Sequence, residues 1–270
     1  MARTIRVISS PSKHMDAVAP TGPWSPMTQP IFADGAQLLV DRMRSMSFEV
    51  LEALWRSSLK LDRHFMDELS ALDVHHGTSP AVLAFTGVEF RTMDPASWND
   101  KAADWLQEHF RILSGLYGML RPRDAIMPYR LEYNMELRMP CRVVAPGKTV
   151  DEPAKTLFKF WGEAVTGELE AEGGKGGVHV VNLASEEYAH AIKPWLSPDT
   201  PITTCVFLEE YTLTHTDVQR GTNSKEARGT MARWMAENAV EDPEQLRDFN
   251  LGYRLDESRS GDGVLAFIKE

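Results

Sequence analysis

Two periodicities of apolar residues alternate along the chain. Short β-branched and apolar runs between turn residues predict strands at 4–10, 81–87, 179–185, 202–210, 212–219 and 263–269, with a hairpin joining the runs at 202–210 and 212–219. Apolar positions three and four residues apart predict helices at 36–46, 47–70, 99–113, 156–172 and 223–238. Because these elements interleave, we expect an α/β or α+β fold with one mixed sheet. No clear linker is present, so residues 1–270 are predicted to form a single domain.

Composition narrows the functional class. Apolar residues make up 43% and charged residues 25% of the chain, as in globular proteins. No run of 18 apolar residues is present, and the N-terminus lacks the apolar block of a signal peptide, so we expect a cytoplasmic protein without a membrane partner. Cys141 and Cys205 show no disulfide or zinc spacing, and the adjacent His75 and His76 need not converge. The glycine-rich segment 173–177 lacks the spacing of a phosphate loop, and we expect neither a metal nor a cofactor.

Charge is unevenly distributed along the sequence. The net charge of −10 repels polyanions on average, so binding of nucleic acid requires a separate basic face. Residues 109–130 carry four arginines against Asp124, whereas residues 237–257 carry seven acids against two arginines. This asymmetry predicts a polarised surface, and the basic stretch is the natural place to look for an anion.

The basic stretch contains two glycines, Gly115 and Gly118, between apolar segments that we expect to be helical. A helix-hairpin-helix would expose backbone N–H groups of this turn to a DNA phosphate, with Arg121 and Arg123 beside it. A glycine-rich cap packed on the core, with surface arginines, fits the spacing equally well. In a third interpretation, side chains of this stretch line one pocket for an anionic small molecule: Ser114, Tyr117, Arg121, Tyr129 and Arg130.

Three further groups of polar residues lie at predicted element boundaries. Lys13 follows the first strand, where α/β folds bind ligands, and could contact phosphate or act as a base; an exposed turn is the alternative. Asn182, Ser185 and Glu187 lie at a strand-to-helix junction, followed by Lys193, and Ser185 could contact a ligand or merely cap the helix. Lys225 and Arg228 share a face near a helix start, where cations oppose the dipole and an anion would stabilise them; exposure to solvent explains either one alone.

Five segments together resemble the YaaA peroxide-stress protein family: SPSK at 10–13, LSGLYGMLRPRDAIMPYRLE at 113–132, FWG at 160–162, NLASEEY at 182–188 and KEARGTMARWMAEN at 225–238. The resemblance implies one α/β domain with a helix-hairpin-helix element, DNA binding through a positive cleft, and a part in limiting free iron and DNA damage during peroxide stress. It carries family positions onto Lys13, Ser114, Gly115, Tyr117, Gly118, Arg121, Asp124, Tyr129, Arg130, Asn182, Ser185, Tyr188, Lys193, Lys225 and Arg228. Glu226 and Asn223 stand where the family often has a second Lys and an aromatic residue, which removes charge from the expected DNA face.

Two functional hypotheses follow. In the first, the protein binds DNA without reading its sequence, through the Gly115–Gly118 turn, Arg121, Arg123, Lys225 and Arg228. In the second, it is an enzyme for a small anionic or nucleotide-like substrate, because phosphate contacts alone have no use for Tyr, Ser, Glu and Asn at fixed spacings. The candidate catalytic residues of the second hypothesis are Lys13, Tyr117, Tyr129, Glu187 and Lys225.

Overall fold

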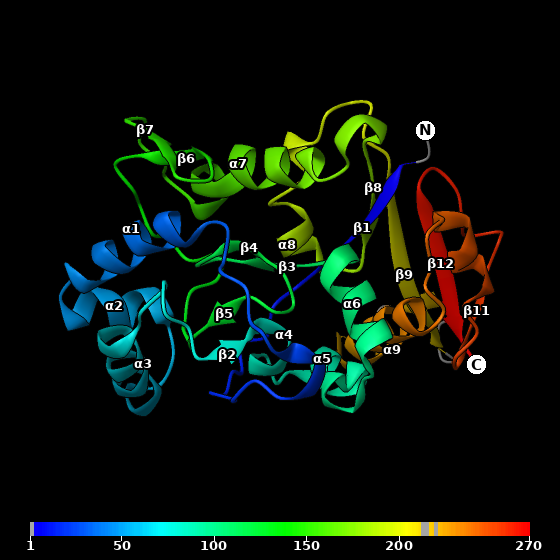
Figure 1. Cartoon of the computed structure of the whole chain (residues 1–270), viewed down its shortest axis with the longest axis horizontal. Helices are drawn as coiled ribbons and strands as arrows, with labels where there is room; N and C mark the ends of the chain where they lie inside the picture. Colours follow the sequence, from blue (N-terminus) through cyan, green and yellow to red (C-terminus); the bar gives the residue numbers. More distant parts are fainter. Residues whose placement is uncertain (1–2, 212–215, 219–220) are drawn as a thin grey trace.

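A twisted, mostly parallel sheet runs through the molecule in this computed structural model, which describes residues 3–211, 216–218 and 221–270. The strand order is β11-β12-β9-β8-β1-β3-β4, and the β1–β3, β1–β8, β8–β9 and β9–β12 pairs are parallel (Figure 1). The strands are β1 (Thr4–Ser9), β3 (Phe110–Ser114), β4 (Gly118–Leu120), β8 (Val178–Asn182), β9 (Ile202–Tyr211), β11 (Tyr253–Leu255) and β12 (Val264–Lys269). The predicted mixed α/β class is therefore confirmed.

Smaller strand pairs accompany this sheet. They are β2 (Ser79–Pro80) with β5 (Ala125–Ile126), and β6 (Arg142–Ala145) with β7 (Lys148–Val150), whereas β10 (Thr216–Val218) pairs with β9 and belongs to the main sheet. The β9–β10 pair is antiparallel, as the predicted hairpin requires, although residues 212–215 and 219 of that prediction lie outside the described residues.

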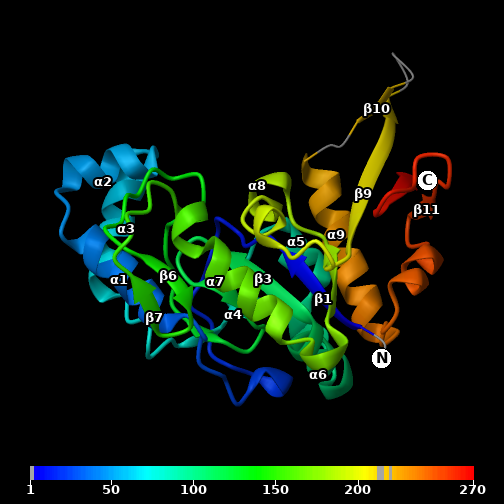
Figure 2. The same ribbon diagram turned by 90° about the horizontal axis from the view of Figure 1, so that it is seen from above.

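Helices cover both sides of the sheet. They are α1 (Ala33–Arg44), α2 (Phe48–Trp55), α3 (Leu59–Ala71), α4 (Ala81–Ala84), α5 (Val88–Met93), α6 (Asp100–His109), α7 (Leu157–Ala171), α8 (Glu186–Ala189) and α9 (Gly221–Glu237). Figure 1 shows α7 on one side of β3 and β4 and α6 on the other, whereas α1, α2 and α3 gather at one end of the molecule in both views (Figure 2). No helix among the described residues is both long and apolar enough to cross a membrane.

Side-chain caps define several of these helices. Asn99 accepts a hydrogen bond from the backbone N–H of Ala102 at the start of α6, and Thr156 accepts one from Lys159 at the start of α7. The predicted helix over 47–70 is two helices, because Arg56 adopts a left-handed conformation with φ of 50° between α2 and α3. Such a residue ends a helix and turns the chain.

Two predictions for the first half of the chain are wrong. The predicted strand over 81–87 begins with the short helix α4, since a brief buried apolar run does not distinguish strand from helix. The predicted helix-hairpin-helix is a β-hairpin: the helix predicted over 99–113 ends at His109, and β3 and β4 pair antiparallel with Ser114 opposite Gly118, which follows the turn over 115–117 with φ of 68°. Strand β3 is buried along its whole length, and its sequence, FRILS, lacks the alternation of a strand with one exposed face.

Candidate functional site

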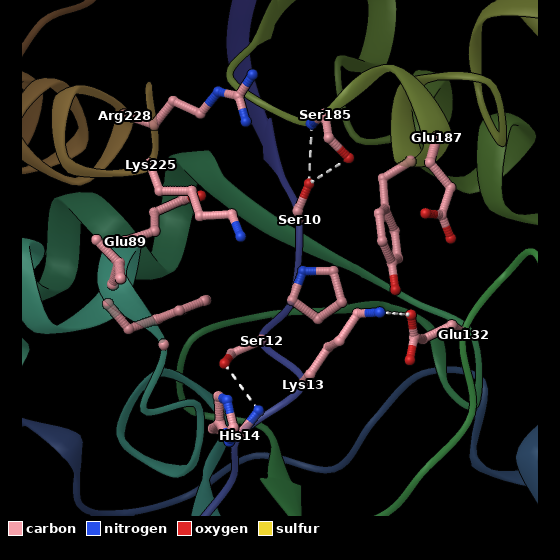
Figure 3. Close-up of a pocket in the computed structure, with 15 residues that line it drawn as sticks. Ser10, Ser12, Lys13, His14, Glu89, Glu132, Ser185, Glu187, Lys225 and Arg228 are labelled. Carbon is pink, nitrogen blue, oxygen red and sulfur yellow. Dashed lines mark hydrogen bonds and ion pairs between the residues drawn. The ribbon is translucent and has the colours of Figure 1, made fainter. Parts of the chain in front are cut away.

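The carboxyl end of β1 lies where the direction of strand succession reverses. From β1 the chain continues to β3 on one side and returns to β8 on the other, which is the crevice where open α/β sheets bind ligands. A cavity of about 380 Å³ opens there (Figure 3). Its lining comes from the segment after β1, from α5, α8 and α9, and from Glu132: Ser10, Pro11, Ser12, Lys13, His14, Gly87, Val88, Glu89, Phe90, Glu132, Ser185, Glu187, Tyr188, Lys225 and Arg228.

Helix α9 supplies a cationic wall to this cavity. Lys225 and Arg228, three residues apart, both line it, as their helical spacing allows. Arg228 is only 8% exposed, and the described part of the structure records no hydrogen bond or ion pair for its guanidinium, whose Nε is fully buried. Burial lowers the pKa of Arg228, and the nearby charge of Glu89 raises it.

Glu89 on α5 lies beside the cationic wall. The hydroxyl of Ser9, the last residue of β1, donates a hydrogen bond to its buried carboxyl group. Burial raises the pKa of Glu89 to about 7, against the smaller opposing effects of Ser9, Arg228 and Lys225. Gly229 allows α9 to pack this close to α5, because a Cβ at this position would lie 2.2 Å from the Glu89 carbonyl oxygen.

An acidic wall faces α9 across the cavity, formed by Glu132 and Glu187 (Figure 3). Glu132 is buried and paired twice: its Oε2 lies 2.7 Å from Lys13 Nζ, and its Oε1 lies 2.6 Å from Arg130 Nη2. Glu187 Oε1 is buried without a hydrogen-bond partner. Burial, and then the charge of Glu132, raise the pKa of Glu187.

Two serines, Ser10 and Ser185, lie between the two walls (Figure 3). The backbone N–H of Ser185 donates to Ser10 Oγ at 2.9 Å, and the two hydroxyl oxygens are 3.2 Å apart. This contact fixes the β8–α8 turn against the segment after β1. Asn182 lies behind it, buried, and its side-chain oxygen accepts the backbone N–H of Ala184.

The structure brings only part of the predicted site together. Six residues singled out from the sequence line the cavity, and the first and the last of them are more than 200 positions apart: Lys13, Ser185, Glu187, Tyr188, Lys225 and Arg228. Arg130 and Tyr129 line adjoining cavities that share Lys13 with this one. Lys193 lies outside it, with its Nζ 3.6 Å from Glu186.

The predicted residues of the 109–134 stretch mostly belong to the core or to other ion pairs. Ser114 and Tyr117 are fully buried, and Ser114 shares a hydrogen bond with the Tyr129 hydroxyl at 2.6 Å. Gly115 and Gly118 are buried in the hairpin. Arg121 pairs with Glu172, and Arg123 pairs with Asp104 at 2.6 Å. Burial raises the pKa of both Tyr117 and Tyr129, so neither phenol readily loses its proton.

Three cavity residues with evident chemical roles were not predicted from the sequence: Ser10, Glu89 and Glu132. Glu132 ends the LSGLYGMLRPRDAIMPYRLE segment, and Ser10 lies in the polar cluster after the first strand, so both carried a signal. Glu89 carried no such signal in the sequence, because no other polar residue of a recognisable motif surrounds it.

No metal site is evident in the part of the chain that the structure describes. Among the described residues, no three His, Cys, Asp or Glu side chains converge as ligands for a metal ion.

The fold and this cavity define an α/β protein with a polar, charge-divided site at the carboxyl edge of its sheet. The sequence model of a family described as peroxide stress protein YaaA matches residues 5–259. Similar proteins, each named UPF0246 protein, occur in Pediococcus pentosaceus (34% identity), Lactiplantibacillus plantarum (33%) and Laribacter hongkongensis (35%). Each alignment covers 98% of this chain and 98–99% of the relative. The chain belongs to the peroxide stress protein YaaA family.

Proposed function

We propose that this protein is an enzyme that binds a small anionic substrate in the cavity between β1, α5, α8 and α9 and transfers a proton to or from it. The observation that carries the proposal is Arg228, a buried guanidinium without a hydrogen bond or ion pair in the described part of the chain, facing a cavity. Leaving such a charge buried without a partner costs several kcal/mol, so its retention implies a partner that arrives from outside.

The charge balance on this side of the cavity also favours an anion. Lys225 and Arg228 contribute two positive charges, and Glu89 is the acidic group beside them. Because the pKa of Glu89 is about 7, this carboxyl is only partly ionised near neutral pH. A net positive charge therefore remains, and the carboxylate or phosphate of a ligand would neutralise it.

Proton transfer is assigned to Glu89. A general acid or base works best when its pKa is near the operating pH, and the buried carboxyl group of Glu89 meets that condition beside the anion-binding groups. Ser9 orients it by a hydrogen bond. Lys13 is the second candidate, but Glu132 already holds its ammonium group at 2.7 Å.

This arrangement differs from the DNA interface that the resemblance implied. Arg121 and Arg123 are engaged in ion pairs away from Lys225 and Arg228, and the turn between β3 and β4 is buried, so a DNA backbone would not meet these groups together. In our proposal, any part in limiting oxidative damage and free iron is carried out through chemistry on a small molecule.

Calorimetric titration with inorganic phosphate tests the anion site. We expect binding to the wild-type protein and a loss of at least about tenfold in affinity for Arg228→Met and for Lys225→Met, because a charged hydrogen bond contributes about 1.5–3 kcal/mol. Arg123→Met is the matched control and should bind phosphate as the wild type does, since this arginine lies outside the cavity.

Titration with duplex DNA over a range of salt concentrations tests the opposite view. DNA binding that falls by orders of magnitude as salt rises, and that depends on Arg121 and Arg123, would establish an open phosphate track and overturn our proposal. Absence of phosphate binding by the wild-type protein would overturn it as well.

A further inference from the structure

We propose that the ligand is a zwitterion, held with its anionic group against Lys225 and Arg228 and with a protonated amine against Glu187 and Glu132. This inference rests on the proposed function, because it assigns the second end of the ligand that the anion site would bind. It depends on a feature that anion binding alone does not explain, namely that one cavity has walls of opposite charge.

The two walls come from different parts of the chain and lie on opposite sides of the cavity. Figure 3 shows Lys225 and Arg228 on one side, Glu132 and Glu187 on the other, and Ser10 between them. Each wall contains buried polar atoms without a hydrogen-bond partner among the described residues: Nε of Arg228 on the cationic side, and Oε1 of Glu187 and of Glu132 on the acidic side. A donor and two acceptors thus lack partners in residues that line the same cavity.

Glu187 is the acidic group with spare capacity. Lys13 and Arg130 already occupy the two oxygens of Glu132, at 2.7 and 2.6 Å. Glu187 lies close enough to Glu132 for that charge to raise its pKa, and a backbone hydrogen bond from Asn134 and the charge of Lys13 compensate only in part. A ligand ammonium offers three donors and a positive charge, so it would give the Glu187 carboxyl group a counter-charge and relieve the repulsion between the two carboxylates.

Other ligand classes fit less well. A simple monoanion would neutralise the α9 wall but leave the carboxyl groups of the opposite wall without a further counter-charge. A ligand with anionic groups at both ends would place one of them beside Glu187 and Glu132, where like charges repel. A simple amine would leave the guanidinium of Arg228 without a partner.

The test compares ω-amino carboxylates of increasing chain length with the n-alkanoate and the n-alkylamine of equal length, by calorimetric titration of the full chain. We expect one length of amino carboxylate to bind at least about tenfold more tightly than either matched compound, because it satisfies both walls. This comparison uses the wild-type protein, so it does not depend on whether any variant folds.

Glu187→Gln identifies the group that recognises the amine. We expect the amino carboxylate to bind this variant no better than the alkanoate does, while phosphate affinity stays within about twofold of wild type. Glu186→Gln is the control, because Glu186 is the neighbouring residue on α8 but is exposed and pairs with Lys193, outside the cavity. It should retain the preference for the amino carboxylate.

The outcomes separate this inference from the proposed function. If phosphate binds through Arg228 but alkanoates bind as tightly as amino carboxylates, the anion site stands and the zwitterion proposal is overturned. If the preference exists but survives in Glu187→Gln, the acidic wall does not recognise the amine and the inference is again wrong. If neither phosphate nor any of these compounds binds, both proposals fail.

Discussion

Buried arginines occur in two regions of this protein, and their surroundings differ. Arg6 on β1 and Arg111 on β3 are each 3% exposed and enclose Glu172, which follows α7; Arg121 adds a third cation. We call these four residues the Glu172 cluster. Arg6 Nε and Arg111 Nη2 lie 2.7 and 2.8 Å from Glu172 Oε2, and backbone carbonyls accept most of the other N–H groups of the two arginines. Arg228, at 8% exposure, makes no ion pair or hydrogen bond with the side chain of any described residue, and only the acidic charge of Glu89 lies nearby.

Buried arginines therefore have a structural role in the Glu172 cluster and, in our proposal, a ligand-binding role at Arg228. In the Glu172 cluster the chain supplies its own counter-ion, so the guanidinium groups need nothing further. Arg228 is similarly buried but lines a cavity, and Glu187 and Glu132 line the opposite wall of that cavity. Position in the sheet agrees with this division, because Arg6 lies in the first half of β1, whereas the cavity lies beyond its carboxyl end.

The largest expected effect is in the Glu172 cluster. Glu172→Gln removes the shared counter-ion of Arg6 and Arg111, which leaves the buried Arg111 unpaired and Arg6 with only the exposed Glu108, so we expect the free energy of unfolding to fall by about 3–5 kcal/mol. Urea denaturation at neutral pH measures it. Glu108→Gln, which removes the exposed partner of Arg6, should cost less than about 1 kcal/mol. Equal small losses for both variants would show that the cluster is not needed for stability.

A smaller effect of opposite sign is expected in the cavity. Arg228→Met replaces a buried unpaired charge by an apolar side chain of similar length, so we expect the ligand-free protein to gain about 1–3 kcal/mol in the free energy of unfolding. Urea denaturation without phosphate measures this gain. Arg233, farther along the same helix, is partly exposed and pairs with Asp94 and Glu237, so Arg233→Met should change stability by no more than about 1 kcal/mol. A loss of stability in Arg228→Met would mean that Arg228 has a structural partner, and would remove the contrast between the two regions.

Sequence periodicity predicted most of the parallel sheet and its covering helices, because long amphipathic or apolar segments determine these elements locally. It could not predict β3 and β4, since strands buried on both faces lose their alternation. The concentration of arginines at 109–130 was likewise misleading. Arg111 and Arg121 belong to the Glu172 cluster, whose acidic partner comes from a distant helix end, and no local pattern announces such a pairing.

The candidate site shows the same limit. The spacing of Lys225 and Arg228 correctly predicted a shared face, because that is a property of one helix. Their position opposite Glu187 and near Glu89 depends on the order of strands in the sheet and on the close approach of α5 and α9 at Gly229. Both are tertiary facts, so Glu89 could be recognised as a candidate acid or base only once its surroundings were known.

The smallest effect concerns the pH dependence of stability, where Glu89 and Glu172 should act in opposite directions. Burial alone would raise the pKa of Glu172, but Arg111 and Arg6 together lower it, so its contribution to stability is present above the unfolded value of 4.5 and is lost as the pH falls. The folded pKa of Glu89 is raised to about 7, so the folded state retains a proton that the unfolded chain releases. The contribution of Glu89 to the free energy of unfolding is therefore complete below about pH 4.5 and is lost as the pH rises to about 7.

Urea denaturation of the wild type and Glu89→Gln across this pH range isolates the effect, since every other group titrates in both proteins. We expect the wild type to lose on the order of 1 kcal/mol relative to Glu89→Gln between about pH 4.5 and pH 7. Parallel curves would show that Glu89 titrates as an exposed glutamate does. The cavity would then lack the tuned carboxyl group, and with it the physical basis for assigning proton transfer to Glu89.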